Sequence, residues 1–196
     1  MKKVNNIAYI DGQNLFFGTT KCDLCAKELN KDLKEMKFED CVCGKAWKVD
    51  LKKFRIYLEE KYGVKEAYYY LGYQKQKYDE LYLEVQRAGF IISFKDHGNL
   101  LRSEKKGNVD TDIVLEIMKN IIDRNEEFDR FILVSCDGDY FKLVKYLVSK
   151  NRFKKILFPN KRFSSSLYNE LGSEYFDYLE NVKSYIILID NKINKG

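Results

Sequence analysis

Apolar stretches alternate with amphipathic stretches along most of the chain. Short, mainly apolar or aromatic runs predict strands at residues 7–11, 64–73, 90–94, 130–135 and 154–159. Between them, apolar residues recur at helical spacing and predict helices at 48–63, 77–89, 109–128 and 139–151. The first two helical patterns stop at Gly63 and Gly89, as helices often do. The tail at 165–190 reads as helical, then extended at 185–189.

The order of these elements predicts the fold class. Strands that alternate with helices at this spacing indicate right-handed crossovers and a mainly parallel sheet. Strands 7–11, 130–135 and 154–159 are nearly all apolar, as expected when helices cover both faces of a sheet. We therefore expect an α/β fold, a Rossmann-like three-layer α/β/α sandwich. Residues 18–47 fit this pattern poorly and are predicted to be a small insertion.

Composition narrows the class of protein. The chain has 196 residues, 45% hydrophobic and 33% charged, which favours one globular domain over 1–196. Its formal charge of +5 leans only slightly toward anionic partners. The N-terminus lacks the long apolar core of a signal peptide, and no apolar run reaches the roughly 20 residues of a membrane helix. We expect a cytoplasmic protein with reduced cysteines and no membrane partner, and leave a homo-oligomer open.

Acidic residues follow the predicted strands at their carboxyl ends. Asp11 ends the first strand in "YIDGQN", and Asp137 and Asp139 follow the fourth in "VSCDGDYF". Asp110 opens the long helix at 109–128. Ligands bind outside the carboxyl ends of the strands in open α/β sheets, so these acids should converge at one edge.

Helical phase separates Asp110 from its neighbour Asp112. Asp110 shares the face of Ile117 and Ile121, which we expect to turn toward the sheet, whereas Asp112 falls on the opposite side. Each acid has a simpler interpretation, as a turn former or a helix cap. Caps do not explain why the acids converge, because crowded carboxylates repel one another. The set therefore predicts a Mg²⁺ or Mn²⁺ site with all-oxygen ligands.

Three segments carry a resemblance to a known family. "YIDGQNLFFG", "KGNVDTDIVLEIM" and "ILVSCDGDYFKLVKYL" resemble, in order and spacing, the signature segments of the NYN domain family, which belongs to the PIN-like nucleases. The resemblance covers nearly the whole chain except 18–47. It implies a PIN-like sandwich that binds Mg²⁺ or Mn²⁺ and cuts RNA. One departure is Cys136, where the family usually has a glycine.

The resemblance also implies roles for individual residues. Asp11 corresponds to the metal ligand of the first strand, with Asn14 as its helper, and Asp110, Asp137 and Asp139 correspond to the other acids. A second acid on the long helix corresponds to Asp112 or Glu116, and both are expected to support the metal ligands without binding the metal themselves. The complete expectation is a catalytic metal group of Asp11, Asp110, Asp137 and Asp139, supported by Asn14, Asp112, Ser135, Lys161 and Arg162.

This set of residues indicates a hydrolytic mechanism. A metal ion held by the aspartates can acidify a bound water and clamp a phosphate, which predicts a Mg²⁺- or Mn²⁺-dependent endoribonuclease. Asp139 is our first choice for a carboxylate that orients the water. The reaction needs no histidine, and His97 is expected in a solvated loop.

Basic residues near the same edge could hold the substrate. Arg102, Lys105 and Lys106 follow the third strand, and Lys161 and Arg162 follow the last. They suit the backbone phosphates of RNA, for which we expect a single strand. The alternative is that they are ordinary solvated side chains. The serines at 164–166 could cap the next helix and offer amides to a phosphate.

Four cysteines lie within the insertion. "CDLC" contains Cys22 and Cys25, and "CVC" contains Cys41 and Cys43. Two close pairs in a reduced protein suggest one tetrahedral structural zinc ion, which would also help a polar segment to fold. The alternatives are a redox pair and four incidental thiols.

Two other functions remain open from the sequence. A catalytically weak RNA-binding or regulatory module could have the same fold, although all the expected acids are present. A metal-dependent phosphohydrolase is the second alternative. Phosphatases of the haloacid dehalogenase type would place a D-x-D pair directly after the first strand, where this chain has "DGQN".

Overall fold

The computed structural model describes residues 4–71, 79–94 and 109–189. In chain order the helices and longer strands are β1 Asn6–Asp11, α1 Gly12–Thr20, α2 Asp23–Glu28, α3 Leu51–Tyr62, β2 Val64–Leu71, α4 Asp79–Arg87, β3 Ile91–Phe94, α5 Val109–Asp123, β4 Phe131–Val134, α6 Phe141–Ser149, β5 Phe153–Phe158, β6 Phe176–Tyr178 and α7 Lys183–Ile186. Short 3₁₀ turns join them at Phe38–Asp40, Gly138–Tyr140, Lys161–Phe163, Ser166–Leu171, Ser173–Tyr175 and Leu179–Val182.

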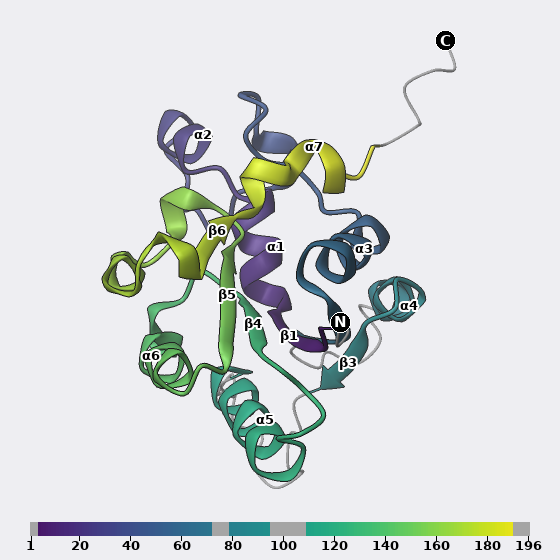
Figure 1. The fold of residues 1–196 in the computed structure, drawn as a ribbon. Coiled ribbons are helices and arrows are strands. Elements are labelled where there is room, and N and C mark those ends of the chain that lie inside the picture. Colours follow the sequence, from purple (N-terminus) through teal and green to yellow (C-terminus); the bar gives the residue numbers. More distant parts are fainter. Residues whose placement is uncertain (1–3, 72–78, 95–108, 190–196) are drawn as a thin grey trace, which may run out of the picture.

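The strands form one sheet in the order β3-β2-β1-β4-β5-β6, and every pair in it is parallel. Helices α1, α3, α4 and α7 cover one face, and α5 and α6 cover the other (Figure 1). The predicted three-layer α/β/α sandwich with a parallel sheet is therefore confirmed. No helix in the described part of the chain is long and apolar enough to cross a membrane.

The direction in which successive strands are added to the sheet reverses between β1 and β4. From β1 the chain proceeds through β2 to β3 on one side, then returns to place β4 against the other side of β1. Ile10 pairs with Val134, so Asp11 and Ser135 leave the sheet next to each other. This reversal creates the crevice in which ligands bind in open α/β folds.

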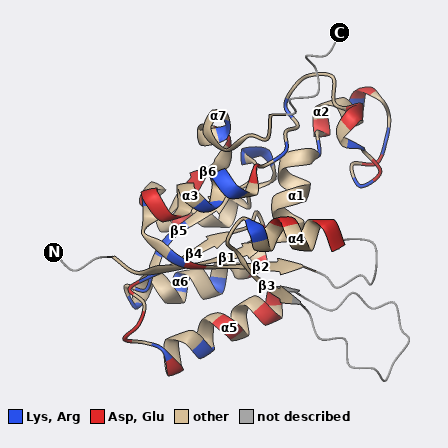
Figure 2. Ribbon diagram, turned by 90° about the vertical axis from the view of Figure 1, so that its right-hand side faces the viewer, with Lys and Arg blue, Asp and Glu red and all other residues tan. Residues whose placement is uncertain are grey.

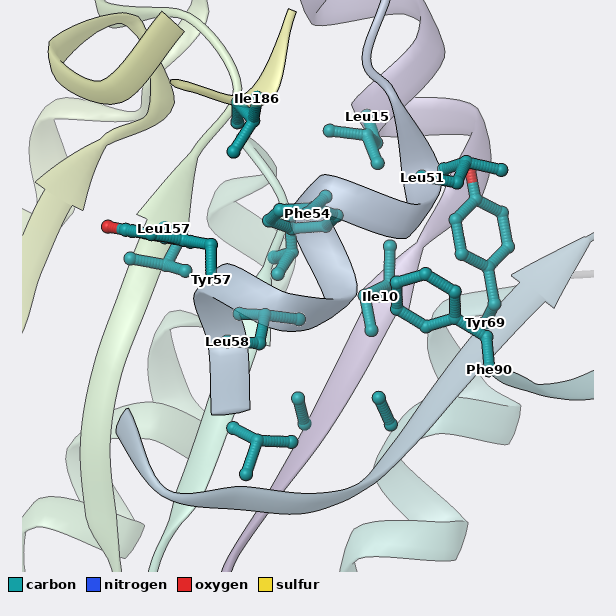
Figure 3. Packing of buried hydrophobic residues seen from close by; sticks show 14 of the residues in the cluster. Ile10, Leu15, Leu51, Phe54, Tyr57, Leu58, Tyr69, Phe90, Leu157 and Ile186 are labelled. Carbon is teal, nitrogen blue, oxygen red and sulfur yellow. The ribbon is translucent and has the colours of Figure 1, made fainter. Parts of the chain in front are cut away.

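Two apolar clusters hold the layers together, one on each face. On the first face, Phe54 and Leu58 of α3 are completely buried, and they pack among Ile10 of β1, Leu157 of β5 and Tyr69 of β2 (Figure 3). Helix α3 begins at Asp50, whose side chain accepts from the Lys53 amide, and ends at Gly63 with φ of 65°. Left-handed backbone of this kind favours glycine, so the predicted helix end at Gly63 is confirmed.

The elements differ from the sequence prediction in three places. Helix α5 stops at Asp123, before the predicted end at residue 128. The tail predicted as helical forms 3₁₀ turns and the short strand β6, and residues 185–189 supply the end of α7 and one bridge between Val49 and Ile187. A three-residue strand is too short to show a period, which explains why β6 was not predicted.

The third difference concerns residues 18–47. Helix α1 occupies Gly12–Thr20 and so extends into this range, and Trp47 at its far end is buried in the first apolar cluster. The glycines of α1 obscure the helical pattern in the sequence. A Cβ at Gly18 would lie 2.6 Å from Cβ of Pro159, so the glycine allows α1 to approach the chain after β5.

Candidate functional site

The candidate site begins where β1 meets α1. Asp11 is the last residue of β1 and the N-cap of α1. Its Oδ1 accepts from the Asn14 amide and its Oδ2 from Asn14 Nδ2, both at 2.9 Å. Asn14 Oδ1 in turn accepts from the Cys136 amide at 3.2 Å. Asn14 therefore joins the carboxyl ends of β1 and β4, as expected for a residue that supports Asp11.

The loop after β4 is held by hydrogen bonds within it and around it. Buried Ser135 accepts the Asp137 amide at its Oγ, 3.1 Å away, and Asp137 Oδ1 accepts the Asp139 amide at 2.9 Å. The Tyr168 hydroxyl donates to the Asp137 carbonyl at 2.7 Å. A Cβ at Gly138 would lie 2.8 Å from Ser165 Oγ, so the glycine lets the loop pack closely. The positions of both aspartates are therefore fixed by bonds within the loop and by contacts with the chain after β5.

Cys136 fits this loop without strain. The positive-φ residues of the described chain other than glycine are Asn30 and Asn151, so the backbone of Cys136 lies in an ordinary region. Its buried thiol donates to the Asn160 carbonyl at 3.6 Å. The Cys136 side chain thus joins the loop after β4 to the chain after β5.

Three of the predicted acids come together. Carboxylate oxygens of Asp110, Asp137 and Asp139 all lie within 4.8 Å of one another. Asp110 comes from the first turn of α5, where its Oδ1 accepts from the Tyr140 hydroxyl at 2.5 Å. Oxygens on opposite sides of a magnesium ion lie about 4.2 Å apart, because each Mg–O distance is about 2.1 Å. The spacing of the three carboxylates is therefore close to that of ligands to one ion.

Asp11 lies close to this group without being one of the three. Its side chain is only 3% exposed, and its pKa is raised to about 6. Burial is the main cause and the charges of Asp110 and Asp137 add to it, while the hydrogen bonds from Asn14 oppose the rise. Burial also raises the pKa of Tyr140, reinforced by the charge of Asp11, so Tyr140 remains a hydrogen-bond donor. A cation here would stabilise the charged form of Asp11.

The charge distribution agrees with the position of this group. Acidic residues, drawn in red, lie at the start of α5, at the edge where the neighbouring strands end (Figure 2). Asp137 and Asp110 are half-buried and Asp139 is exposed, so the group opens to solvent. Carboxylate oxygens at such an edge are the ligands that Mg²⁺ and Mn²⁺ prefer.

The remaining predicted residues lie in different surroundings. Asp112 is half-buried; burial raises the pKa of Tyr70, and the charge of Asp112 adds slightly to this rise. Arg162 forms an ion pair, with its Nε 2.9 Å from Oδ1 of Asp23 in α2. Lys161 extends over the ring of Tyr178, with Nζ 5.7 Å from the ring centre. Neither basic residue has a recorded contact with the acids. His97, Arg102, Lys105 and Lys106 lie outside the described residues.

Two tyrosines were missed by the sequence analysis. Tyr140 holds Asp110, and Tyr168 holds the backbone of Asp137. Both are buried, and their rings belong to the apolar cluster on the α5–α6 face. Tyr140 directly follows Asp139 in the "DGDYF" segment, and this position next to the acids could have marked it as a site residue. Nothing in the local sequence distinguishes Tyr168 from a core aromatic residue.

The four cysteines form a second candidate metal group. The Sγ atoms of Cys22, Cys25, Cys41 and Cys43 lie within 4.8 Å of one another, and all four are free thiols. They come from the segment between α1 and α3, around α2, which lies at the edge of the molecule beyond the end of α1 (Figures 1 and 2). The protein therefore has two groups that could each hold a metal, one of oxygen ligands and one of sulfur ligands.

Comparisons with known proteins show the family and the fold. The chain is 23% identical over 181 residues to low amplitude and bright protein LabA of Synechococcus elongatus, which covers 91% of this chain and 85% of that protein. The fold is similar to a crystal structure of a protein of unknown function from Vibrio parahaemolyticus, with a TM-score of 0.62, 19% identity, and coverage of 95% of this chain and 97% of that one. A family model described as the NYN domain matches residues 7–179. The chain belongs to the NYN domain family.

Proposed function

We propose that this protein is a Mg²⁺- or Mn²⁺-dependent endoribonuclease that hydrolyses RNA at the aspartates around β1, α5 and β4. Membership of the NYN family supports a nuclease or RNA-related function in general, since these domains are generally nucleases that bind RNA. The observation that carries the finer proposal is the three-carboxylate group at the point where the sheet order reverses.

The proposed metal ligands are Asp110, Asp137 and Asp139, with Asp11 behind them. Asp137 uses Oδ1 to accept the Asp139 amide, so its second oxygen is the one suited to a metal. A bound Mg²⁺ or Mn²⁺ supplies an acidified water and a positive charge opposite the phosphoryl oxygens. This role fits the chemistry of the donors, which are all carboxylate oxygens.

The protein's own residues position the reaction. Tyr140 donates to Asp110 and fixes one acid against the loop that carries the other two. Asn14 and Ser135 fix the ends of β1 and β4. Asp139 is exposed, and we assign its carboxylate oxygen that does not bind the metal to orient the attacking water. Residues that hold ligands in this way commonly affect the activity of metal sites by about 10–100-fold.

The preference for RNA over small esters rests on the open site. Asp139 lies at the surface and the other two acids are half-buried, so a phosphate within a long chain can reach them. The same openness supports endonucleolytic cutting. We further propose that the site belongs to a single domain over 1–196, in which the cysteine-containing segment is an insertion.

A substrate panel tests the proposal. Labelled single-stranded RNA, duplex RNA, single-stranded DNA and a small phosphate ester are incubated with Mg²⁺, with Mn²⁺ or with EDTA. We expect internal cuts in single-stranded RNA with either metal and none with EDTA. Binding of RNA without cleavage would instead support a binding module, and hydrolysis of the small ester alone would support a phosphohydrolase.

A further inference from the structure

The sulfur atoms of the cysteine group have the spacing of ligands to one metal ion. Cys22 Sγ lies 3.4 Å from Cys43 Sγ, which lies 3.7 Å from Cys41 Sγ. A tetrahedral zinc ion with Zn–S distances of about 2.3 Å separates its ligand sulfurs by about 3.8 Å. The fourth sulfur, of Cys25, is within 4.8 Å of the others. These separations suit a single ion in the middle of the four.

The backbone around the second cysteine pair also suits thiolate ligands. The Ala46 amide donates to Cys41 Sγ at 3.3 Å. An amide directed at sulfur favours the charged thiolate, which is the form that binds metal. Hydrogen bonds to the ligands are a regular part of metal sites, where they fix the ligand orientation.

The surrounding segment has little else to hold it together. Its own apolar cluster has only four buried residues, Cys22, Cys25, Ala26 and Met36. Two of the four are cysteines of the group itself. A core of this size stabilises a fold weakly, and small segments commonly need a metal or a cross-link in addition.

Other ways of using four cysteines fit less well. Two disulfides would also use all four sulfurs, but bonded sulfurs lie about 2.05 Å apart, whereas these are free thiols with neighbouring sulfurs 3.4 and 3.7 Å apart. An iron–sulfur cluster places several atoms between its ligands, so they must lie farther apart than ligands to one ion. A single tetrahedral ion is the arrangement that uses all four at these separations.

The segment contacts the chain that borders the acids. Asp23, between two of the cysteines, pairs with Arg162 of the loop after β5. In the same loop, Asn160 Nδ2 donates to the Gly18 carbonyl at 3.0 Å, and the Asn160 carbonyl accepts from the Cys136 thiol. The Ser165 amide donates to the Cys136 carbonyl at 3.3 Å. These bonds connect the cysteine segment to the loop that carries Asp137 and Asp139.

We propose that Cys22, Cys25, Cys41 and Cys43 bind one structural zinc ion, and that the zinc-bound segment holds the loop after β5 in place beside the acids. Zinc orders α2, which positions Asp23 for Arg162. The paired Arg162 then keeps residues 160–165 packed against the loop after β4. The ion has no part in hydrolysis at this position, since its ligands complete a closed tetrahedral site.

Metal analysis of the full-length protein tests the site independently of any nuclease activity. We expect about one zinc per chain after purification, and, after removal of zinc under reducing conditions, cobalt absorption bands of a tetrahedral thiolate site. The double variant Cys22→Ser/Cys25→Ser should lose the metal, whereas Cys136→Ser, which changes the remaining cysteine, should keep it. Wild-type protein that binds neither zinc nor cobalt, or that contains iron, would overturn the proposal.

A second variant tests the connection to the acid loop without touching a ligand. Asp23→Asn should retain zinc and increase amide hydrogen exchange in residues 160–165, whereas Glu28→Gln, at the end of the same helix, should change neither. Unchanged exchange in the zinc-bound Asp23→Asn protein would contradict the proposed role of the segment. Because the readouts are metal content and exchange, a failed nuclease assay would leave both results interpretable.

Discussion

The acid group and the cysteine group are both candidate metal sites, but the fold supports them differently. The acids lie at the ends of β1 and β4 and at the start of α5, and these elements pack in the two large apolar clusters. The cysteines lie in a segment whose own cluster has four buried residues. Folding thus brings the acids together despite their repulsion, whereas we propose that the cysteine segment depends on its bound zinc. Removing the metal should leave the first site folded and should unfold the second.

The largest expected effect is on catalysis at the acids. Asp137→Asn keeps an oxygen that can accept the Asp139 amide but removes the charge, so RNA cleavage should fall by more than about 100-fold while thermal stability changes little. The assay is the initial rate on single-stranded RNA in Mg²⁺. Asp123→Asn, at the exposed far end of α5, is the matched control and should cleave normally. Equal rates for the two variants would exclude the acid group as the active site.

Removing metal from the cysteines should cause a large but local change. Because the segment's own apolar cluster is small, zinc removal should expose residues 21–46 to limited proteolysis while the sheet stays folded by circular dichroism. Removing Mg²⁺ alone should not expose them. Cooperative unfolding of the whole chain on zinc removal would show that the two regions are not separate in stability.

The buried charge of Asp11 predicts a pH dependence. The pKa of Asp11 is raised from 3.8 to about 6, so the folded state favours the protonated form. Protonated Asp11 therefore makes its full contribution to folding stability below about pH 4, and this contribution is lost above pH 6. We therefore compare the free energy of unfolding of the Asp11→Asn variant with that of the wild type, both without metal. The difference should shift in favour of the variant by up to about 3 kcal/mol between pH 4 and pH 7. Denaturant unfolding at each pH measures this difference.

Added Mg²⁺ provides the internal control for this experiment. At pH 7 the cation should stabilise charged Asp11 and the acids beside it, and so reduce the advantage of the variant. A relative stability that does not change with pH would contradict the raised pKa.

Tyr140→Phe should produce a smaller effect on catalysis. The substitution removes the hydroxyl that donates to Asp110 while keeping the buried ring in place. Hydrogen bonds to charged groups contribute about 1.5–3 kcal/mol, so we expect cleavage to slow by about 10- to 100-fold at low Mg²⁺. High Mg²⁺ should restore part of the rate if the tyrosine acts by positioning Asp110. A loss that is the same at all metal concentrations would argue against that role.

The smallest expected effect concerns the ion pair between the two regions. Both side chains of the Asp23–Arg162 pair are about one quarter exposed, so its loss in Arg162→Gln should cost less than about 1 kcal/mol. Thermal unfolding in low and high salt measures this cost, which should decrease as salt screens the pair. A cost well above this value would show that Arg162 supports more than one contact.

Much of the fold could be predicted because hydrophobic patterns reflect burial. The continuous apolar runs at β1, β4 and β5 indicated strands covered on both faces, and the structure has them at the centre of the parallel sheet. Helix α1 was missed because Gly12 and Gly18 interrupt its pattern, although Gly18 serves close packing against Pro159. Strand β6 was missed because three residues that pair with β5 have no local signature.

The candidate site was predictable in part for the same kind of reason. The position of Asp110, Asp137 and Asp139 follows from strand ends and helical phase, both of which the sequence shows. The support from Tyr168 and Ser165 depends on how the chain after β5 returns to the loop after β4, and no local pattern encodes that contact.

The most direct test of the central claim is an anomalous scattering map from crystals soaked in Mn²⁺. We predict a peak at bonding distance, about 2.2 Å, from carboxylate oxygens of Asp110, Asp137 and Asp139, with Asp11 next to it. The peak should disappear in the Asp137→Asn protein. A wild-type map without manganese at these oxygens, or with manganese bound elsewhere in the described fold, would contradict the account.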